Sequence, residues 1–268
     1  MKLSIVLSTQ PASFSALAYK GQLAENLNKI KKLGYDGVEL AVRDPELLDQ
    51  ENLKTLLVRN NLIVPAIGTG QAYGEEGLSF AHPDFSVREK AINRLKAQIR
   101  FAAGLDAIVI VGLMRGILEN GVNKDQADDW MSSALIECAK ENPKVKIAIE
   151  PINRYETNFL NTVESSLRLV NKMAVDNIGL LLDSFHMNIE EPSPPHSIEN
   201  AKDRLFHFHV ADSNRWYPGA GHIDFKQIVE KLSDIGYWGF LSAEILPEPD
   251  PDTAAQKTIE TMGPLVKQ

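Results

Sequence analysis

The sequence predicts a single (β/α)₈ TIM barrel, and three observations support this prediction. The chain has 268 residues, close to the roughly 250 residues typical of one such barrel. Short apolar runs alternate with amphipathic segments along the whole chain, as parallel strands joined by helices require. Polar residues end several of these runs at intervals of about one strand–helix unit. We therefore predict one barrel domain over residues 1–268, without a linker or a second domain.

Eight apolar runs are predicted as strands. The first, Leu3–Leu7, is too short for the apolar segment of a signal peptide and fits a strand better. The other seven predicted strands are Gly37–Leu40, Ile63–Ile67, Ala107–Val111, Lys146–Glu150, Gly179–Asp183, Leu205–His209 and Gly239–Glu244. Eight such runs with helices between them favour a closed parallel barrel over an open sheet.

Segments between the strands show helical periodicity and recognisable ends. The clearest examples are Leu23–Leu33, Val87–Ala103 and Ala127–Lys140. Gly34 and Gly236 lie in two nearly identical phrases, and we predict that both adopt the left-handed conformation that follows a helix. Two long connections, Gly68–Phe80 and Asp212–His222, follow the third and seventh strands. On a barrel they would border the catalytic face.

Composition limits the partners and the compartment. The net charge of −8 argues against nucleic acid or an anionic membrane surface as a partner. No run approaches the roughly 18 apolar residues of a membrane span. The single cysteine, Cys138, excludes an internal disulfide and fits a reducing compartment. We predict a soluble, cytoplasmic protein in which Cys138 is a buried structural thiol.

Polar residues end four consecutive predicted strands in the second half of the chain. They are Glu150, Asp183, His209 and Glu244. Because the C-terminal ends of barrel strands surround one site, these side chains are expected to converge. Carboxylates packed together would repel one another, and a cation would remove this repulsion. Three carboxylates and an imidazole suit one divalent ion per subunit, with Mn²⁺ as the first candidate and Mg²⁺ or Co²⁺ as alternatives.

Further polar residues lie just beyond these strand ends. We predict that Glu156, His186 and Arg215 surround the metal with hydrogen-bonding groups. His207 points the same way as His209, because the two lie two positions apart on one strand. It is predicted as a hydrogen-bonded histidine of the interior or a supporting group behind the metal ligands.

The sequence leaves the roles of four other side chains undecided. Arg43 and Arg115 follow the second and fourth strands, where each could either meet a substrate carboxylate or lie on the surface. Trp216 and Tyr217 could serve an interface or cover the substrate.

The segments Glu150–Glu156, Asp183–Asn188, His207–Arg215, Pro218–Asp224 and Ala243–Glu244 together carry a resemblance to a known family. They resemble the xylose-isomerase-like sugar epimerases and isomerases, particularly the ketose 3-epimerases that act on tagatose, psicose or ribulose. The resemblance covers essentially the whole chain. The segments Ala41–Pro45 and Ala66–Tyr73 are similar to those of the bacterial 5-keto-L-gluconate epimerases.

The resemblance implies roles for the residues already singled out. Positions matching Glu150 and Glu244 bind the metal and exchange a proton with the substrate in that family. Positions matching Asp183 and His209 are metal ligands. Those matching Glu156, His186 and Arg215 contact substrate hydroxyls. All seven positions carry the family's residue type here.

The resulting hypothesis is a metal-dependent epimerase of an unphosphorylated ketose or keto-sugar acid. One glutamate removes a proton beside the ketone, and the other returns a proton to the opposite face of an enediolate. Such relatives are commonly dimers or tetramers, so we expect a homodimer or homotetramer whose ligand is a small ketose or keto-acid.

Three alternative functions stay open. The first is another activity of the same fold: hydroxypyruvate isomerase, aldose–ketose isomerase or inosose dehydratase. The second is a hydrolase like the apurinic/apyrimidinic endonucleases, which use a cluster of metals with many histidines. This chain has six histidines and an acidic balance. The third is a non-catalytic sugar-binding barrel, and the paired glutamates count against it.

Overall fold

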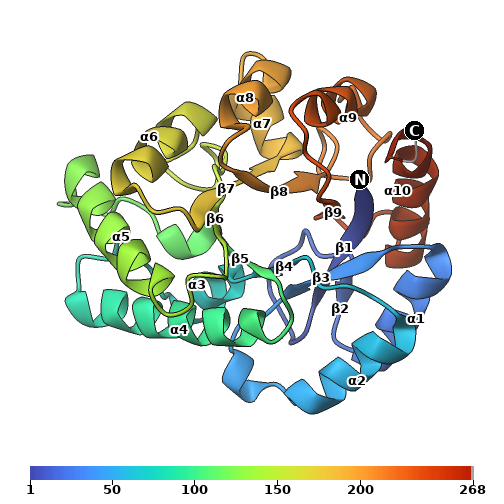
Figure 1. The fold of residues 1–268 in the computed structure, drawn as a ribbon, viewed down its shortest axis with the longest axis horizontal. Helices are drawn as coiled ribbons and strands as arrows, with labels where there is room; N and C mark the ends of the chain where they lie inside the picture. The colour runs from blue at the N-terminus through green and yellow to red at the C-terminus, as the bar shows by residue number, and fades with distance from the viewer. Residues whose placement is uncertain (267–268) are drawn as a thin grey trace.

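The computed structural model describes residues 1–266, and within this range the strands form a closed parallel barrel surrounded by helices (Figure 1). The strands are β1 Lys2–Ser8, β2 Tyr19–Lys20, β3 Gly37–Ala41, β4 Ala66–Gly68, β5 Ile108–Val111, β6 Ile147–Ile149, β7 Ile178–Asp183, β8 Leu205–Val210 and β9 Phe240–Ala243. Strands β1 and β3 to β9 pair in chain order, and β9 pairs back onto β1. The predicted (β/α)₈ barrel is confirmed.

Strand β2 is an addition that the sequence did not predict. The lower part of β1, Lys2–Ile5, pairs with β9, whereas its last two residues pair with Tyr19 and Lys20. A two-residue strand is too short for any periodicity, so pattern analysis could not find it.

Helices surround the barrel and pack on its strands (Figure 1). They are α1 Leu23–Leu33, α2 Gln50–Asn60, α3 Gly70–Glu76, α4 Phe85–Ala103, α5 Lys124–Ala139, α6 Val163–Met173, α7 Ser184–Glu190, α8 Pro194–Ala201, α9 Phe225–Asp234 and α10 Pro251–Val266, with short 3₁₀ turns η1 Pro45–Leu47 and η2 Leu113–Arg115. Several begin at a capping side chain, such as Asp84, whose carboxylate accepts the Ser86 N–H at 2.8 Å. Gly34 and Gly236 are left-handed, with φ of 96° and 75°, as predicted.

Two predicted elements differ from the structure. Strand β4 begins at Ala66 instead of Ile63, because Pro65 has no N–H to donate to a neighbouring strand. Ile63 keeps one isolated bridge to Gly37. The long connection Gly68–Phe80 contains α3, although its glycines disfavour a helix. Burial of Gln71 and Ala72 in this helix overrides that preference.

The main hydrophobic core lies between the strands and the surrounding helices, and it includes the buried Cys138. The barrel interior holds a smaller apolar cluster of Ala66, Ile110, Ala148 and Leu181. Buried polar side chains, among them Glu39, His207 and His209, also occupy the interior. Within residues 1–266, no helix is both long enough and apolar enough to cross a bilayer.

Candidate metal centre

The structure brings together the four residues predicted at strand ends. Asp183 is the last residue of β7 and His209 lies in β8, while Glu150 and Glu244 directly follow β6 and β9. One potential ligand atom from each of the four lies within 4.8 Å of those from the other three. Because β6, β7, β8 and β9 are neighbours in this order, the two glutamates occupy the two ends of the group.

Three of these atoms have no partner of their own. Glu150 Oε1, Asp183 Oδ2 and His209 Nδ1 are buried and make no hydrogen bond within residues 1–266. His209 Nδ1 lies 3.7 Å from each of the two oxygens, too far for a hydrogen bond. Burying polar atoms without a partner is costly. A divalent cation about 2 Å from each atom would satisfy all three, so this donor set fits a metal.

Local structure holds each donor in place. Asp183 Oδ1 accepts the Phe185 N–H at 2.6 Å and caps α7, which leaves Oδ2 free to face the cluster. Gly112 gives the Glu150 carboxylate its room, since a Cβ there would lie 2.7 Å from Glu150 Oε2.

The pKa values of Glu150 and Glu244 show that ionised carboxylates are unfavourable in this buried cluster. Burial, and then the charge of Glu244, raises the pKa of Glu150 to about 8. Burial raises the pKa of Glu244 to about 7, although His209 and Arg215 act in the opposite direction. Two carboxyl groups with raised pKa values at one cavity can exchange protons near neutral pH.

His186 is held as a neutral donor facing the cluster. Burial lowers the pKa of His186 to about 4. Asn153 Oδ1 accepts the Tyr155 N–H at 2.9 Å, so its Nδ2 donates to His186 Nδ1 at 2.7 Å and to Glu156 Oε1 at 2.9 Å. His186 Nδ1 is therefore the acceptor, and Nε2 carries the proton, 3.7 Å from Glu150 Oε1.

Arg215 connects two carboxylates, those of Glu156 and Glu244. Its Nη1 donates to Glu156 Oε1 at 2.7 Å and its Nη2 to Glu244 Oε2 at 3.2 Å. The guanidinium carbon lies 5.1 Å from the centre of the Phe14 ring and 4.9 Å from that of Phe185. The two carboxylates and the two rings fix the planar group at the edge of the metal cluster.

A cavity of about 350 Å³ opens above the cluster, a volume suited to a small ligand. Glu150, His209, Glu244, Glu156, His186 and Arg215 all line it. Much of the remaining wall comes from the first half of the chain, where Phe14, Gln71 and Glu75 lie.

Arg43 and Arg115, whose roles the sequence left undecided, do not line the cavity. Arg115 was expected to meet a substrate carboxylate or to lie on the surface, and both expectations are wrong. It is fully buried and donates to the carbonyl oxygens of Gly112 and Leu160. These bonds support the backbone near β5. Arg43 is partly buried, with its Nε 3.6 Å from Glu76. Trp216 is half-buried in the loop after β8.

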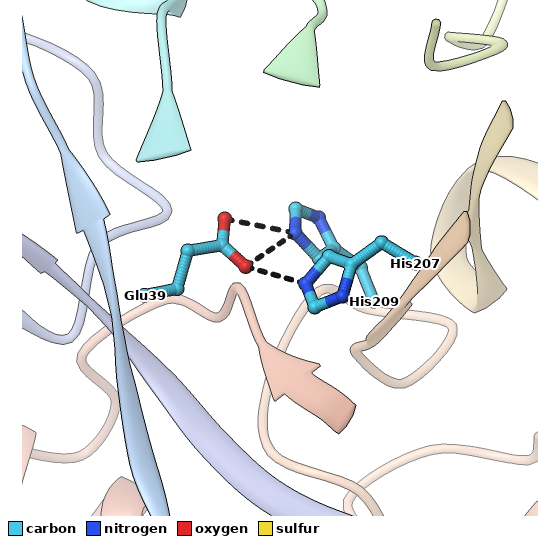
Figure 2. Close-up of side chains that lie close together, drawn as sticks. All are labelled: Glu39, His207 and His209. Atoms are coloured by element: carbon cyan, nitrogen blue, oxygen red, sulfur yellow. Dashed lines mark hydrogen bonds and ion pairs between the residues drawn. The ribbon is translucent and has the colours of Figure 1, made fainter. Parts of the chain in front are cut away.

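Two residues that sequence reasoning missed belong to the site. Asn153 sets the protonation of His186, as described above. Glu39 lies inside β3 and is fully buried against the two histidines of β8 (Figure 2). A single carboxylate within an otherwise apolar strand is the signal that could have identified it, because such a group requires a buried partner.

Comparison with known proteins identifies the family of the barrel. A family model described as a xylose isomerase-like TIM barrel matches residues 27–265. The chain belongs to this family. The D-psicose 3-epimerase of Ruminiclostridium cellulolyticum is 32% identical over 230 residues, which cover 81% of this chain and 76% of that protein. The proteins that this chain resembles in sequence thus include named sugar epimerases.

Two further similar proteins extend the comparison. The 3-dehydro-D-guloside 4-epimerase of Escherichia coli is 26% identical, with 89% of this chain and 91% of that protein covered. A crystal structure of D-psicose 3-epimerase with D-tagatose, from Clostridium cellulolyticum H10, superposes with a TM-score of 0.84 over 99% of both chains. At 23% identity, this superposition supports the shared fold alone.

Proposed function

We propose that the protein is a divalent-metal-dependent epimerase of an unphosphorylated ketose or keto-sugar acid. The observation that carries the proposal is the placement of Glu150 and Glu244 at the two ends of one group of metal donors, both lining one cavity. Inversion at a carbon needs a base on one face and an acid on the other, and this pair supplies both.

The proton transfers are assigned to the two glutamates. One carboxylate removes the hydrogen from the carbon beside the ketone, and the other delivers a proton to the opposite face. Without an ion the pKa values of both groups are raised, and a bound cation would shift both toward the ionised form that a base requires. For the reverse substrate the two residues exchange roles.

Other residues hold the metal and orient the sugar. Glu150, Asp183, His209 and Glu244 would bind the ion, which when present polarises the ketone as a Lewis acid. The Nε2–H of His186 donates to a sugar oxygen, and Arg215 with Glu156 positions a neighbouring hydroxyl.

The charge of the cavity wall favours a substrate without phosphate. Within residues 1–266, Arg215 is the one Lys or Arg side chain that lines the cavity, and both Glu156 and Glu244 already pair with it. A phosphate dianion would therefore meet no free cation. A keto-sugar acid would rely on a neutral donor such as Gln71 Nε2, which gives one of its two hydrogens to Ser8 Oγ.

The test follows carbon-bound hydrogen in deuterated water. Mn²⁺-loaded protein is incubated with D-psicose, D-tagatose, L-ribulose or 5-keto-L-gluconate, and the sugars are analysed by NMR after protein and metal are removed. We expect deuterium at the carbon beside the ketone together with the epimer. Glu150→Gln and Glu244→Gln should each slow exchange roughly 10²- to 10⁴-fold, whereas Glu164→Gln, an exposed control on α6, should not.

Asp183→Asn separates metal binding from proton transfer. This variant should bind Mn²⁺ weakly yet regain exchange when Mn²⁺ is in excess, while Glu150→Gln stays inactive. Movement of hydrogen to the neighbouring carbon with formation of an aldose would contradict the epimerase and indicate an isomerase.

A further inference from the structure

Glu39 makes a contact that spans the barrel interior. Its strand, β3, is separated from β8 by β1 and β9. Glu39 Oε2 lies 2.8 Å from His207 Nε2, and both carboxylate oxygens lie 3.0–3.1 Å from His209 Nε2 (Figure 2). All three side chains are about 1% exposed, so water does not compete for these bonds.

The chemistry of these bonds fixes which nitrogen of His209 carries hydrogen. The Glu39 carboxylate has only acceptor oxygens, and these lie at hydrogen-bond distance from the Nε2 atoms of the two histidine rings. His207 and His209 must both donate from Nε2. The lone pair left for coordination by His209 is then on Nδ1, the atom that faces Glu150 and Asp183 without a partner.

We propose that Glu39 is a positioning residue for the metal centre: it holds the Nε2–H of His209 so that Nδ1 points at the ion. This inference rests on the metal site proposed above. A carboxylate behind a metal-binding histidine fixes the ring and raises its basicity. His207 supplies the second donor and keeps the carboxylate from turning toward the other side of the barrel.

An alternative occupant of this cluster is a second metal ion, because Glu39, His207 and His209 also satisfy the spacing of a metal group. The hydrogen-bonded arrangement accounts for the observed contacts without an ion, since the acceptor lies at hydrogen-bond distance from both donors. The stoichiometry of metal binding distinguishes the two, with one Mn²⁺ per chain expected.

The substitution Glu39→Gln keeps the shape and removes the charge. In either orientation its amide group places an NH₂ against His209 Nε2, because Oε1 and Oε2 both contact that atom. The NH₂ would oppose the ring N–H as a donor, and the amide oxygen that stays beside Nε2 is an uncharged and weaker acceptor than the carboxylate. We expect the affinity for Mn²⁺ to fall about 10- to 100-fold.

Affinity is measured on purified full-length protein by titration with Mn²⁺, with free ion counted by EPR. Nitrogen NMR of ¹⁵N-histidine protein loaded with Mg²⁺ reports the protonated atom of His209: Nε2 in the wild type, and a changed signal in Glu39→Gln. Glu164→Gln, the same substitution at an exposed position of α6, is the matched control and should keep the wild-type affinity.

The outcomes separate this inference from the proposed function. Wild-type binding of one Mn²⁺ with a weakened Glu39→Gln supports the positioning role. Equal affinity and an unchanged nitrogen signal in the variant overturn it and leave the metal site standing. Two ions per chain overturn it in favour of a second metal. If Glu39→Gln does not fold, Glu39→Asp replaces it, since the shorter side chain keeps the charge but cannot reach both rings. A wild type that binds no metal overturns both proposals.

Discussion

Arg215 has an unusual backbone for a charged side chain, with φ of 61° in the left-handed region. Two backbone bonds hold it there, from its N–H to Asp212 O at 2.7 Å and from the Leu246 N–H to its carbonyl at 2.9 Å. The strained position sends the guanidinium between Phe14 and Phe185. The loop after β8 is thus shaped to deliver one planar cation to the cavity.

The first residue-level prediction concerns Arg215→Lys. A lysine cannot bridge Glu156 and Glu244 or stack between two rings, so at least one charge-assisted hydrogen bond is lost. Such a loss costs about 1.5–3 kcal/mol, and kcat/KM should fall roughly 10- to 150-fold. Steady-state kinetics on the best substrate of the panel give the measurement.

Arg168→Lys on the exposed face of α6 serves as the matched control and should keep its kcat/KM. Wild-type kinetics in Arg215→Lys would show that the guanidinium geometry has no role at the substrate.

The residues at strand ends were predictable from the sequence, and so was His207 as a buried, hydrogen-bonded histidine, whereas Glu39 was not. Glu150, Asp183, His209 and Glu244 each end an apolar run, so their position followed from the barrel rule. Glu39 lies in the middle of such a run. Its position in the sequence does not predict that two histidines about 170 positions away are its partners. Their roles as ligands and acid–base groups stay predictions until metal binding is measured.

At the level of elements, close packing between β7 and β8 depends on a residue without a side chain. A Cβ at Gly179 would lie 2.4 Å from the Arg204 carbonyl oxygen and 2.6 Å from the Phe206 ring. Neither distance is possible for a real Cβ contact. The strands that carry Asp183 and His209 would have to separate to admit even a methyl group.

Gly179→Ala should therefore destabilise the fold by about 1–3 kcal/mol through overpacking. Gly263→Ala in α10 is the matched control, because a Cβ there meets nothing within 4 Å and alanine favours a helix. Its free energy of unfolding should be equal to or above that of the wild type. Urea denaturation followed by circular dichroism measures both, and an unchanged midpoint for Gly179→Ala would contradict the packing argument.

The elements that periodicity predicted are the ones that bury a clear apolar face. Helix α1 begins and ends where the pattern placed it, and α4 extends two residues further because Asp84 caps it. Helix α3 and strand β2 escaped prediction because their form depends on packing against β1 and the barrel mouth, which local sequence does not encode.

For the whole molecule, stability and metal binding are linked through pH. The pKa values of Glu150 and Glu244 are raised to about 8 and 7 in the folded protein. Between about pH 4.5 and pH 8 the folded state therefore holds protons that the unfolded state has released. The free energy of unfolding of the metal-free protein falls as pH rises through this window.

We expect the melting temperature of chelator-treated protein to decrease from pH 5 to pH 8. A bound cation stabilises the ionised carboxylates, so the gain in melting temperature on adding Mg²⁺ should be larger at pH 8 than at pH 5. Differential scanning fluorimetry at fixed ionic strength, with and without Mg²⁺, measures this difference. A gain that is equal at all pH values would contradict the linkage.

The closed barrel was predictable because alternation of strands and helices persists along the whole chain. The alternation of strands and helices does not determine the subunit contacts or the choice of metal ion. The homodimer or homotetramer and the preference for Mn²⁺ therefore stay predictions.

The metal donors come from β6 to β9, whereas much of the cavity wall above them comes from the first half of the chain. Under the proposed function, the second half carries the metal donors and the sugar contacts Glu156, His186 and Arg215, and the first half shapes much of the remaining wall. A lineage with this architecture can exchange one sugar for another through changes in residues 1–120 while its acid–base chemistry is inherited intact. The 3-epimerase and the 4-epimerase among its relatives are the kind of divergence that such a division allows.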